Sequence, residues 1–184
     1  TENTFDVGTM TVASGGLLTA SHNITTDTFT NQGTLAVGTG TRTLTGNYTQ
    51  TSGGVFRTTV ASDTEYGKLA VSGTATLAGK AEVTVAGAAT ALTQGGVLEG
   101  VITAEKVEGE FAEVTTTSSI YTFSGVYHPT SFDLLVVAPE PEVIEDNVQR
   151  YGSPAALGAA KTLDALASDP GSMAPVIDTL DGLS

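Results

Sequence analysis

The sequence contains no cysteine and no tryptophan, and it is poor in aromatic side chains. The absence of cysteine removes disulfides, thiolate metal sites and cysteine nucleophiles, and it suits a protein that is exported unfolded through an oxidising compartment. Aromatic residues make up 6% of the chain and apolar residues 40%, so the core is expected to consist of many small aliphatic side chains. Such a core is typical of stacked repeats rather than of one aromatic-centred globule.

Basic residues are also scarce. Seven Lys and Arg stand against 20 Asp and Glu, which gives a formal net charge of -13. Because the few basic residues form no cluster that could follow a phosphate backbone, we expect no nucleic-acid binding. All charged residues together are 15% of the chain, so Thr, Ser, Asn and Gln must supply most of the outward polar surface. Threonine-rich outer faces favour β-strands.

Long apolar runs are missing as well. No stretch of 18 consecutive apolar residues occurs, so we expect no membrane-spanning segment. The first residues, Thr1 to Asp6, do not resemble a signal peptide. If the protein is exported, the segment that directs export is expected upstream of this sequence.

The composition changes along the chain. Thirty of the 32 threonines lie at or before Thr130, whereas Ala, Asp and Leu dominate after Pro154. Two prolines flanked by acids at 138–142 favour extended backbone and indicate a linker. Ser153 and Pro154 then form a helix start. The predicted parts are stacked strands (1–96), their C-terminal cap (97–138), an acidic proline-containing linker (139–153) and a helical tail (154–184).

Short alternating segments with the pattern G-x-apolar-x-Val recur before residue 97. In a strand, residues two apart share a face, so the apolar residue and the valine of each copy should point inward together. One such strand cannot bury its face alone, but stacked strands can. Glycines at the corners 31–33 and 52–54 are expected to supply the positive φ of tight bends. The four copies are Gly8–Val12, Gly33–Val37, Gly67–Val71 and Gly79–Val83.

These patterns predict an all-β fold, a right-handed parallel β-helix with a C-terminal β-hairpin cap and a short helical tail. An antiparallel β-sandwich is the alternative, because alternation does not distinguish parallel from antiparallel pairing. A hairpin around His128–Ser131 is expected to cover the open end of the coil and to protect its edge. The predicted strands of the cap are 97–103, 107–114, 120–127 and 132–137.

Two elements resemble the C-terminal passenger region of classical type Va autotransporters, whose passengers form pertactin-like β-helices. Gly46 to Gln50 matches a G-x-Y-x-Q element, and Tyr66 to Gly79 matches Y-x-x-L-x-V-x-G-x-A-x-L-x-G. A helix at 155–167 and the L-x-x-L-S motif of Leu180 to Ser184 resemble the junction before the family's translocator barrel. The resemblance covers roughly residues 42–184. The residues that it implies to be critical for the fold are Tyr48, Gln50, Tyr66, Leu69, Val71, Gly73 and Leu77.

The resemblance implies a non-catalytic passenger stem on the outer surface of a Gram-negative bacterium. Residues 42–138 would act as an autochaperone, a folding nucleus that templates the remaining coils. The expected partners are the protein's own upstream coils and its own C-terminal translocator barrel, with no cofactor. The alternative is a host-cell adhesin that binds through the β-helix surface and acts in virulence. Self-association along the faces of the β-helix also stays open.

Candidate catalytic groups are few. His22 and His128 stand near predicted turns without the spacing of a metal site or a triad, so solvated turn histidines are expected. The aromatic residues are expected in core and cap packing rather than on a ligand platform. The carboxylates expected on a solvated face are Glu105, Glu108, Glu110 and Glu113, and the aromatic residues are Tyr48, Phe56, Tyr66, Phe111, Tyr121, Phe123, Tyr127 and Phe132.

Overall fold

The computed structural model describes residues 6–86, 92–118 and 121–137. The chain divides after Ala138 into two units, and the described residues all belong to the first. The predicted linker (139–153) and helical tail (154–184) lie outside the described residues. Within the described ranges the secondary structure consists of β-strands, which confirms the all-β class for this part. No helix in these ranges could cross a membrane.

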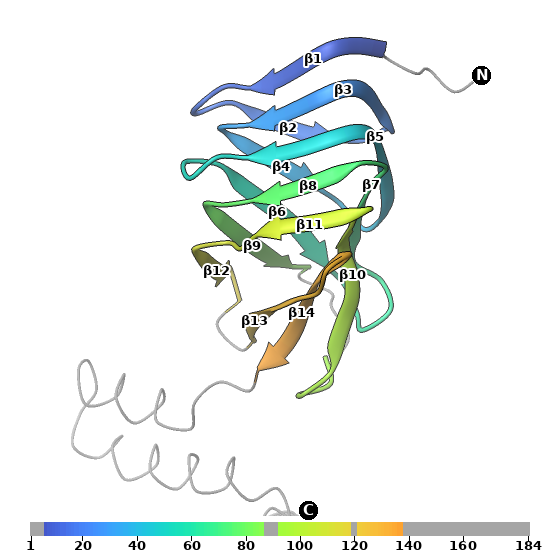
Figure 1. Cartoon of the computed structure of the whole chain (residues 1–184). Helices are drawn as coiled ribbons and strands as arrows, with labels where there is room; N and C mark the ends of the chain where they lie inside the picture. The colour runs from blue at the N-terminus through green and yellow to red at the C-terminus, as the bar shows by residue number, and fades with distance from the viewer. Residues whose placement is uncertain (1–5, 87–91, 119–120, 138–184) are drawn as a thin grey trace, which may run out of the picture. The chain divides into compact units, whose positions relative to one another are not determined.

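The described residues of this unit form fourteen strands (Figure 1). They are β1 (Asp6–Val12), β2 (Leu17–Ala20), β3 (Ile24–Asn31), β4 (Thr34–Val37), β5 (Gly40–Gln50), β6 (Val55–Val60), β7 (Gly67–Val71), β8 (Thr74–Leu77), β9 (Lys80–Val85), β10 (Val97–Thr103), β11 (Lys106–Gly109), β12 (Glu113–Thr116), β13 (Thr122–Tyr127) and β14 (Ser131–Val137).

The chain alternates between two sheets. The first has the order β1-β3-β5-β7-β10-β14-β13, with β8 paired to β5 and β11 paired to β8, and the second has the order β12-β9-β6-β4-β2. All strand pairs among β1 to β12 are parallel. We call one course of the chain through both sheets a pass, and each pass therefore stacks on the preceding one. The antiparallel sandwich does not describe this part.

The register gives the length of each pass. In the first sheet Asn31 pairs with Gln50, 19 residues further along the chain. In the second sheet Arg57 pairs with Glu82, 25 residues further along. The passes are thus of unequal length because the segments between paired residues differ in length, and the register of β3 and β5 shifts by one residue between Thr25 and Thr28.

The G-x-apolar-x-Val segments do not mark equivalent places in successive passes. Gly8–Val12 and Gly67–Val71 lie in β1 and β7 of the first sheet, whereas Gly33–Val37 includes β4 and Gly79–Val83 includes the first four residues of β9 in the second. Their irregular spacing follows from this distribution over two sheets. The prediction that each pair of apolar positions points inward is confirmed, since every one is buried or half-buried.

The first sheet bends within β5, whose two parts pair with different strands. The N-terminal part of β5 pairs with β7, from Gly40 to Leu44, and its C-terminal part pairs with β8 at Tyr48 and Thr49. The bend falls at Gly46, whose φ of 125° lies in the region that favours glycine. Its backbone N–H donates to the Ser72 Oγ at 2.9 Å.

The corner glycines act differently from the prediction. None of Gly33, Gly53 and Gly54 has a positive φ. Gly33 and Gly54 are instead needed for space, because a Cβ at either position would press against carbonyl oxygens of the chain. Close approach of two passes, not a left-handed turn, therefore explains these two glycines.

The C-terminal end of the unit differs from the parallel stack. β10 has the predicted bounds and pairs with β14 in antiparallel fashion, and β13 and β14 form the predicted hairpin, with Tyr127 opposite Phe132. The prediction of one strand over 107–114 is wrong. The segment divides into β11 and β12 in different sheets, because Gly109 (φ 71°) turns the chain and Phe111 is buried between them.

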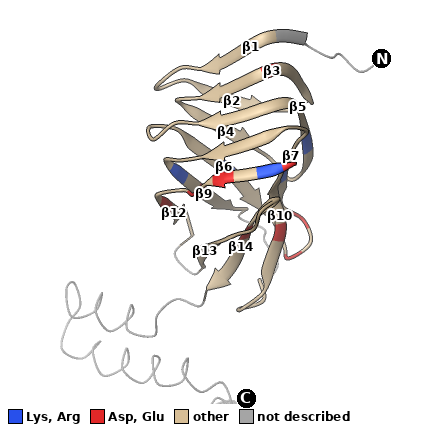
Figure 2. Ribbon diagram, in the orientation of Figure 1, with Lys and Arg blue, Asp and Glu red and all other residues tan. Residues whose placement is uncertain are grey.

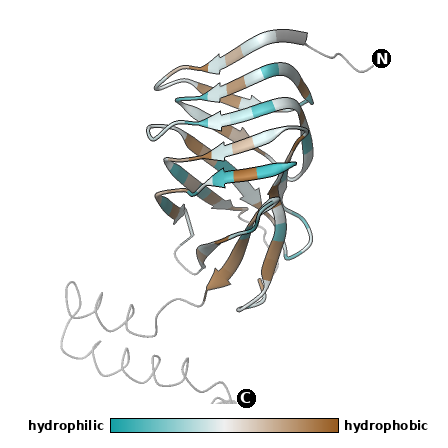
Figure 3. Cartoon of the chain, in the orientation of Figure 1, coloured by the Kyte–Doolittle hydropathy of each residue, from teal (hydrophilic) through white to brown (hydrophobic). Residues whose placement is uncertain are grey.

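The core lies between the sheets and consists largely of aliphatic residues, with aromatic rings both in β3 and β5 and near the hairpin. β14 is largely apolar along its length (Figure 3). It pairs with a strand on each side, and Phe132, Leu134 and Val136 are completely buried. The hairpin therefore belongs to the core of the unit.

We predict that Gly46→Ala destabilises the protein by at least about 2 kcal/mol, because the new Cβ would run into the carbonyl oxygens of Thr26 and Asp27 at a positive φ. Urea unfolding followed by circular dichroism measures the loss. The matched control is Gly53→Ala, where nothing lies within 4 Å of the added Cβ, and a change within about 1 kcal/mol is expected. Equal effects of the two substitutions would contradict this account of the bend.

Candidate functional site

A polar cluster lies inside the aliphatic core, where the C-terminal ends of β3 and β5 pair. Asn31 and Tyr48 have no exposed surface and Gln50 has 1%. Inward alternation carries these side chains from β3 and β5 into the core, and the Asn31–Gln50 register pair places their amides one above the other. Buried polar groups are costly unless they are paired, so their partners decide whether the cluster stabilises the fold.

The three side chains hydrogen-bond to one another. The Tyr48 hydroxyl donates to Gln50 Oε1 at 2.7 Å. Asn31 Nδ2 donates to the same oxygen at 3.2 Å, and to the backbone oxygen of Val55 at 2.9 Å. Asn31 Oδ1 is buried and has no hydrogen-bond partner among the described residues. The cluster thus joins β3 to β5 and to β6 in the other sheet.

Gln50 continues these links into the next pass. Its Nε2 lies within hydrogen-bond distance of three backbone oxygens, those of Gly54 at 3.0 Å, Ala78 at 2.7 Å and Lys80 at 2.9 Å. One side chain therefore connects the pass of Asn31, its own pass and the pass that contains β8 and β9. A slip of one residue in any of these strands would break the set, so Gln50 fixes the register.

Burial also sets the chemistry of Tyr48. Desolvation raises the pKa of its phenol well above the usual value of 10.0, and the hydrogen bond with Asn31 lowers it by less. The hydroxyl therefore stays neutral and keeps its role as donor. The ring stacks on Phe29 of the preceding pass, with centroids 5.9 Å apart. Sequence reasoning missed Phe29 and Asn31, because neither belongs to the motif that drew attention to Tyr48 and Gln50.

The second motif continues the stack below this cluster. The Tyr66 hydroxyl donates to the backbone oxygen of Glu99 at 2.8 Å, which links β7 to the next pass. Leu69 has no exposed surface and is paired in register with Ile102. A Cβ at Gly73 would collide with Asn47 Oδ1, which accepts the N–H of Thr74 at 2.9 Å. Val71 (6% exposed) and Leu77 (2%) complete the buried set of this motif.

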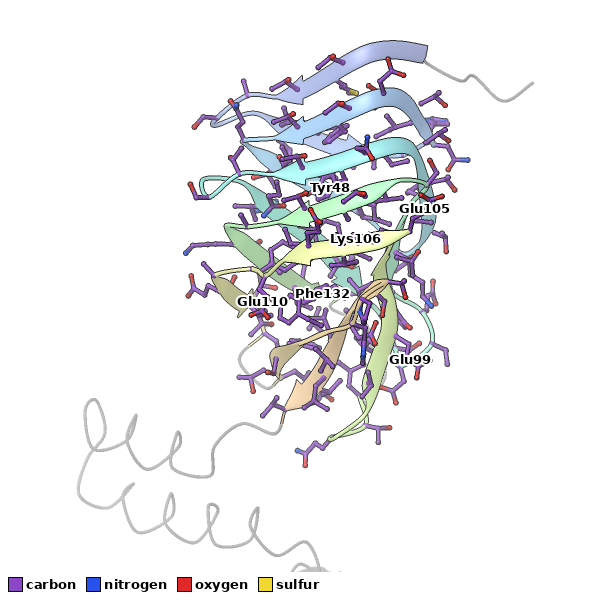
Figure 4. All side chains as sticks on the ribbon, in the orientation of Figure 1. Tyr48, Glu99, Glu105, Lys106, Glu110 and Phe132 are labelled. Carbon is purple, nitrogen blue, oxygen red and sulfur yellow. The ribbon has the colours of Figure 1, made fainter. Side chains whose placement is uncertain are left out.

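Aromatic rings form a second cluster where the hairpin meets the last pass. Phe111 stacks on Phe56 at 6.2 Å and meets Phe132 edge-on at 4.9 Å. Tyr127 lies 5.0 Å from Phe132, and its oxygen accepts the backbone N–H of Phe111 at 3.1 Å. Tyr48 and Phe132 lie at different levels of the stack (Figure 4). The expected packing role of the eight aromatic residues is confirmed: six are buried, and Tyr121 and Tyr127 pack partly buried against the core.

The histidines and acids behave largely as expected of solvated groups. His22 is exposed, and the His128 side chain is 51% exposed, with Nε2 3.3 Å from the Asp133 carboxylate. Asp133 is 6% exposed, and its Oδ1 accepts the N–H of Gly100 at 2.8 Å. Sequence reasoning missed this buried acid. Its hydrogen bond stabilises the irregular part of β10 between Leu98 and Ile102, where Gly100 has a positive φ.

The four glutamates are exposed. Glu99, Glu105 and Glu110 stand apart from one another at the periphery (Figure 4). Glu108 and Glu113 form ion pairs with Lys106 and Lys80. In the part of the chain that the structure describes, no group of His, Asp and Glu could hold a metal ion. The Lys80–Glu113 ion pair links β9 to β12, whereas the Lys106–Glu108 ion pair lies within β11.

Comparison with known proteins gives no relative: neither the models of protein families nor the curated proteins match this chain.

We predict that Gln50→Met lowers the free energy of unfolding by about 3 to 5 kcal/mol, because it keeps the volume but leaves backbone oxygens of two passes and the Asn31 amide without their partner. Chemical denaturation measures the change. Thr49→Ala, at the outward position beside it, is the control and should stay within about 1 kcal/mol. A Gln50→Met variant as stable as the parent would rule out the cluster as a stabilising link.

We further predict a loss of stability in alkali that depends on Tyr48. The phenol has a higher pKa in the folded state than in the unfolded state, so its contribution is complete below pH 10.0 and is lost as the pH rises towards the folded-state pKa. The slope is at most about 1.4 kcal/mol per pH unit. Burial raises the pKa of Tyr127 too, so Tyr48→Phe should flatten this slope without abolishing it. Urea unfolding at several pH values tests this, and an unchanged slope would contradict it.

Proposed function

We propose that this chain is the terminal stem of an autotransporter passenger, a right-handed parallel β-helix in which residues 42–138 act as the folding nucleus for secretion and surface display. The observation that carries the proposal is the concentration of links between passes in that segment. They are the Gln50 hydrogen bonds, the Tyr66–Glu99 hydrogen bond and the Phe56–Phe111–Phe132 cluster.

The physical argument is one of entropy. A stack of parallel strands loses backbone entropy in its first passes before contacts with further passes compensate for it. Segments that link several passes through buried hydrogen bonds and rings lower that barrier, because one ordered pass positions its neighbours. At the other end, β1 and β2 are the edge strands of their sheets, and upstream coils could pair with them. Folding would then spread from the C-terminal passes towards the N-terminus.

The right hand of the coil is part of the proposal. Parallel strands joined by a crossover connection within one sheet are right-handed in about 98% of cases. The two motifs that resemble the autotransporter passenger supply buried residues of β5 and of the two strands paired with it, β7 and β8. This agreement between motif and stacking supports the family assignment. The location on the bacterial surface, the role without catalysis and the translocator barrel as partner follow from that assignment.

Two fragments test the direction of folding. We predict that residues 42–138 melt cooperatively and resist protease, because they retain the Gln50 hydrogen bonds to Gly54, Ala78 and Lys80, the Tyr66–Glu99 hydrogen bond and the ring cluster. The fragment 1–96 lacks Glu99, the hairpin and Phe132, and we expect it to melt gradually. Thermal melts followed by circular dichroism, with limited proteolysis, compare the two fragments. A cooperative 1–96 beside a gradually melting 42–138 would reverse the proposed order.

Surface display tests the function itself. A passenger that lacks this segment should regain protease-resistant display when the segment is supplied separately, since the nucleus would template the stalled coils. A segment with the Gln50→Met substitution is the matched control and should restore less. Saturable binding of the isolated chain to host cells, without any effect on display, would favour the adhesin instead.

A further inference from the structure

The outward face of β1, β3, β5 and β8 is an uncharged array. At two outward positions per strand, seven of the eight residues are threonine and one is asparagine. The register aligns them into two columns that run along the stack, and all eight are exposed or half-buried. The first column is Thr9, Thr28, Asn47 and Thr74, and the second is Thr11, Thr30, Thr49 and Thr76.

The next strand, β11, ends the two columns with opposite charges. Lys106 is paired in register with Thr74, and Glu108 with Thr76. The two side chains form an ion pair of 2.6 Å and are 65% and 46% exposed. Figure 2 shows a blue and a red segment on the strand that Figure 1 labels β11. The nearest acid of β3, Asp27, lies in the irregular bend between Thr25 and Thr28, outside the two columns.

We name the outward face of β1, β3, β5, β8 and β11 the threonine face. We propose that it binds the same face of a second copy, and that the two copies are related by a two-fold axis parallel to the stacking direction. Such an axis keeps the passes of the two copies at the same level and reverses the direction of their strands. The first column of one copy therefore faces the second column of the other. Lys106 then meets the partner copy's glutamate at position 108, and Glu108 meets its lysine at position 106.

The distribution of charge favours a second copy in this orientation as the partner. Two chains of net charge -13 repel each other, so contact is favoured where the surface carries no excess charge. The threonine face satisfies this, and its one ion pair becomes an alternating set of four charges under the proposed axis. An axis perpendicular to the stack would place β11 against β1, with Lys106 and Glu108 opposite threonines. Self-complementarity of this kind is what an isologous interface requires.

The dimensions predict weak association. Five strands at about 4.8 Å span only about 24 Å along the stack, so the buried area is well below the roughly 800 Å² per partner of a stable complex. Threonine loses little side-chain freedom on contact because its β-branched side chain is already restricted. We therefore expect rapid exchange and dimers only at high concentration. Chains anchored side by side with the same orientation would meet this condition.

Charge variants of the full 184-residue chain test the proposal. Sedimentation velocity is measured from about 10 μM to about 1 mM, the range of weak binding. The parent should sediment faster as its concentration rises. Lys106→Glu and Glu108→Lys should each abolish the increase, because like charges then meet across the axis. An equimolar mixture of the two variants should restore it, because each lysine again meets a glutamate.

The controls separate this contact from net charge and from folding. Lys80→Glu breaks the Lys80–Glu113 ion pair of the second sheet and makes the same change in net charge as Lys106→Glu, yet it should associate like the parent. Glu108→Lys makes the chain less acidic, so net charge alone predicts stronger association. Circular dichroism melts verify that each variant is folded. A parent that stays monomeric, variants that associate like the parent, or a mixture that does not associate would each overturn the proposal.

Discussion

Each pass of the chain is too short to bury its own apolar face, so every strand depends on the strands paired with it in the passes above and below. Parallel pairing in register satisfies this dependence, because it places each inward side chain directly over another one. The same constraint reaches the polar groups. Asn31, Tyr48 and Gln50 are tolerated in the core because the register brings their amides, the hydroxyl and backbone oxygens within hydrogen-bond distance.

This dependence also explains why the ends of the stack differ. At the C-terminal end, β14 runs antiparallel to β10 and is itself paired with β13, so the parallel ladder gives way to a hairpin. The rings of Phe111 and Phe132 fill the space below the last pass. At the N-terminal end of the described part, β1 and β2 are each paired on one side with a parallel strand, and no antiparallel hairpin lies beside them there. An asymmetric stack of this kind suits the proposed growth of order from one end.

The same register also aligns the outward residues, which form a surface instead of a core. The alternation that sends Phe29 and Tyr48 inward presents Thr28, Thr30 and Thr49 outward in straight columns. A regular uncharged face on an acidic protein is therefore a direct product of the stacking. The proposed weak dimer would use that regularity, while the proposed folding role uses the interior of the same strands.

The sequence by itself determined which residues face inward, the all-β class, the bounds of β10 and the terminal hairpin. These features depend on alternation and on local turn residues, which are visible within a few positions. It did not determine which sheet each G-x-apolar-x-Val segment joins, or that Gly33 and Gly54 are needed for space rather than for positive φ. It also missed the break at Gly109 and the partners of Gln50. These depend on contacts between residues about 20 to 30 positions apart, and only the stacked structure brings those residues together.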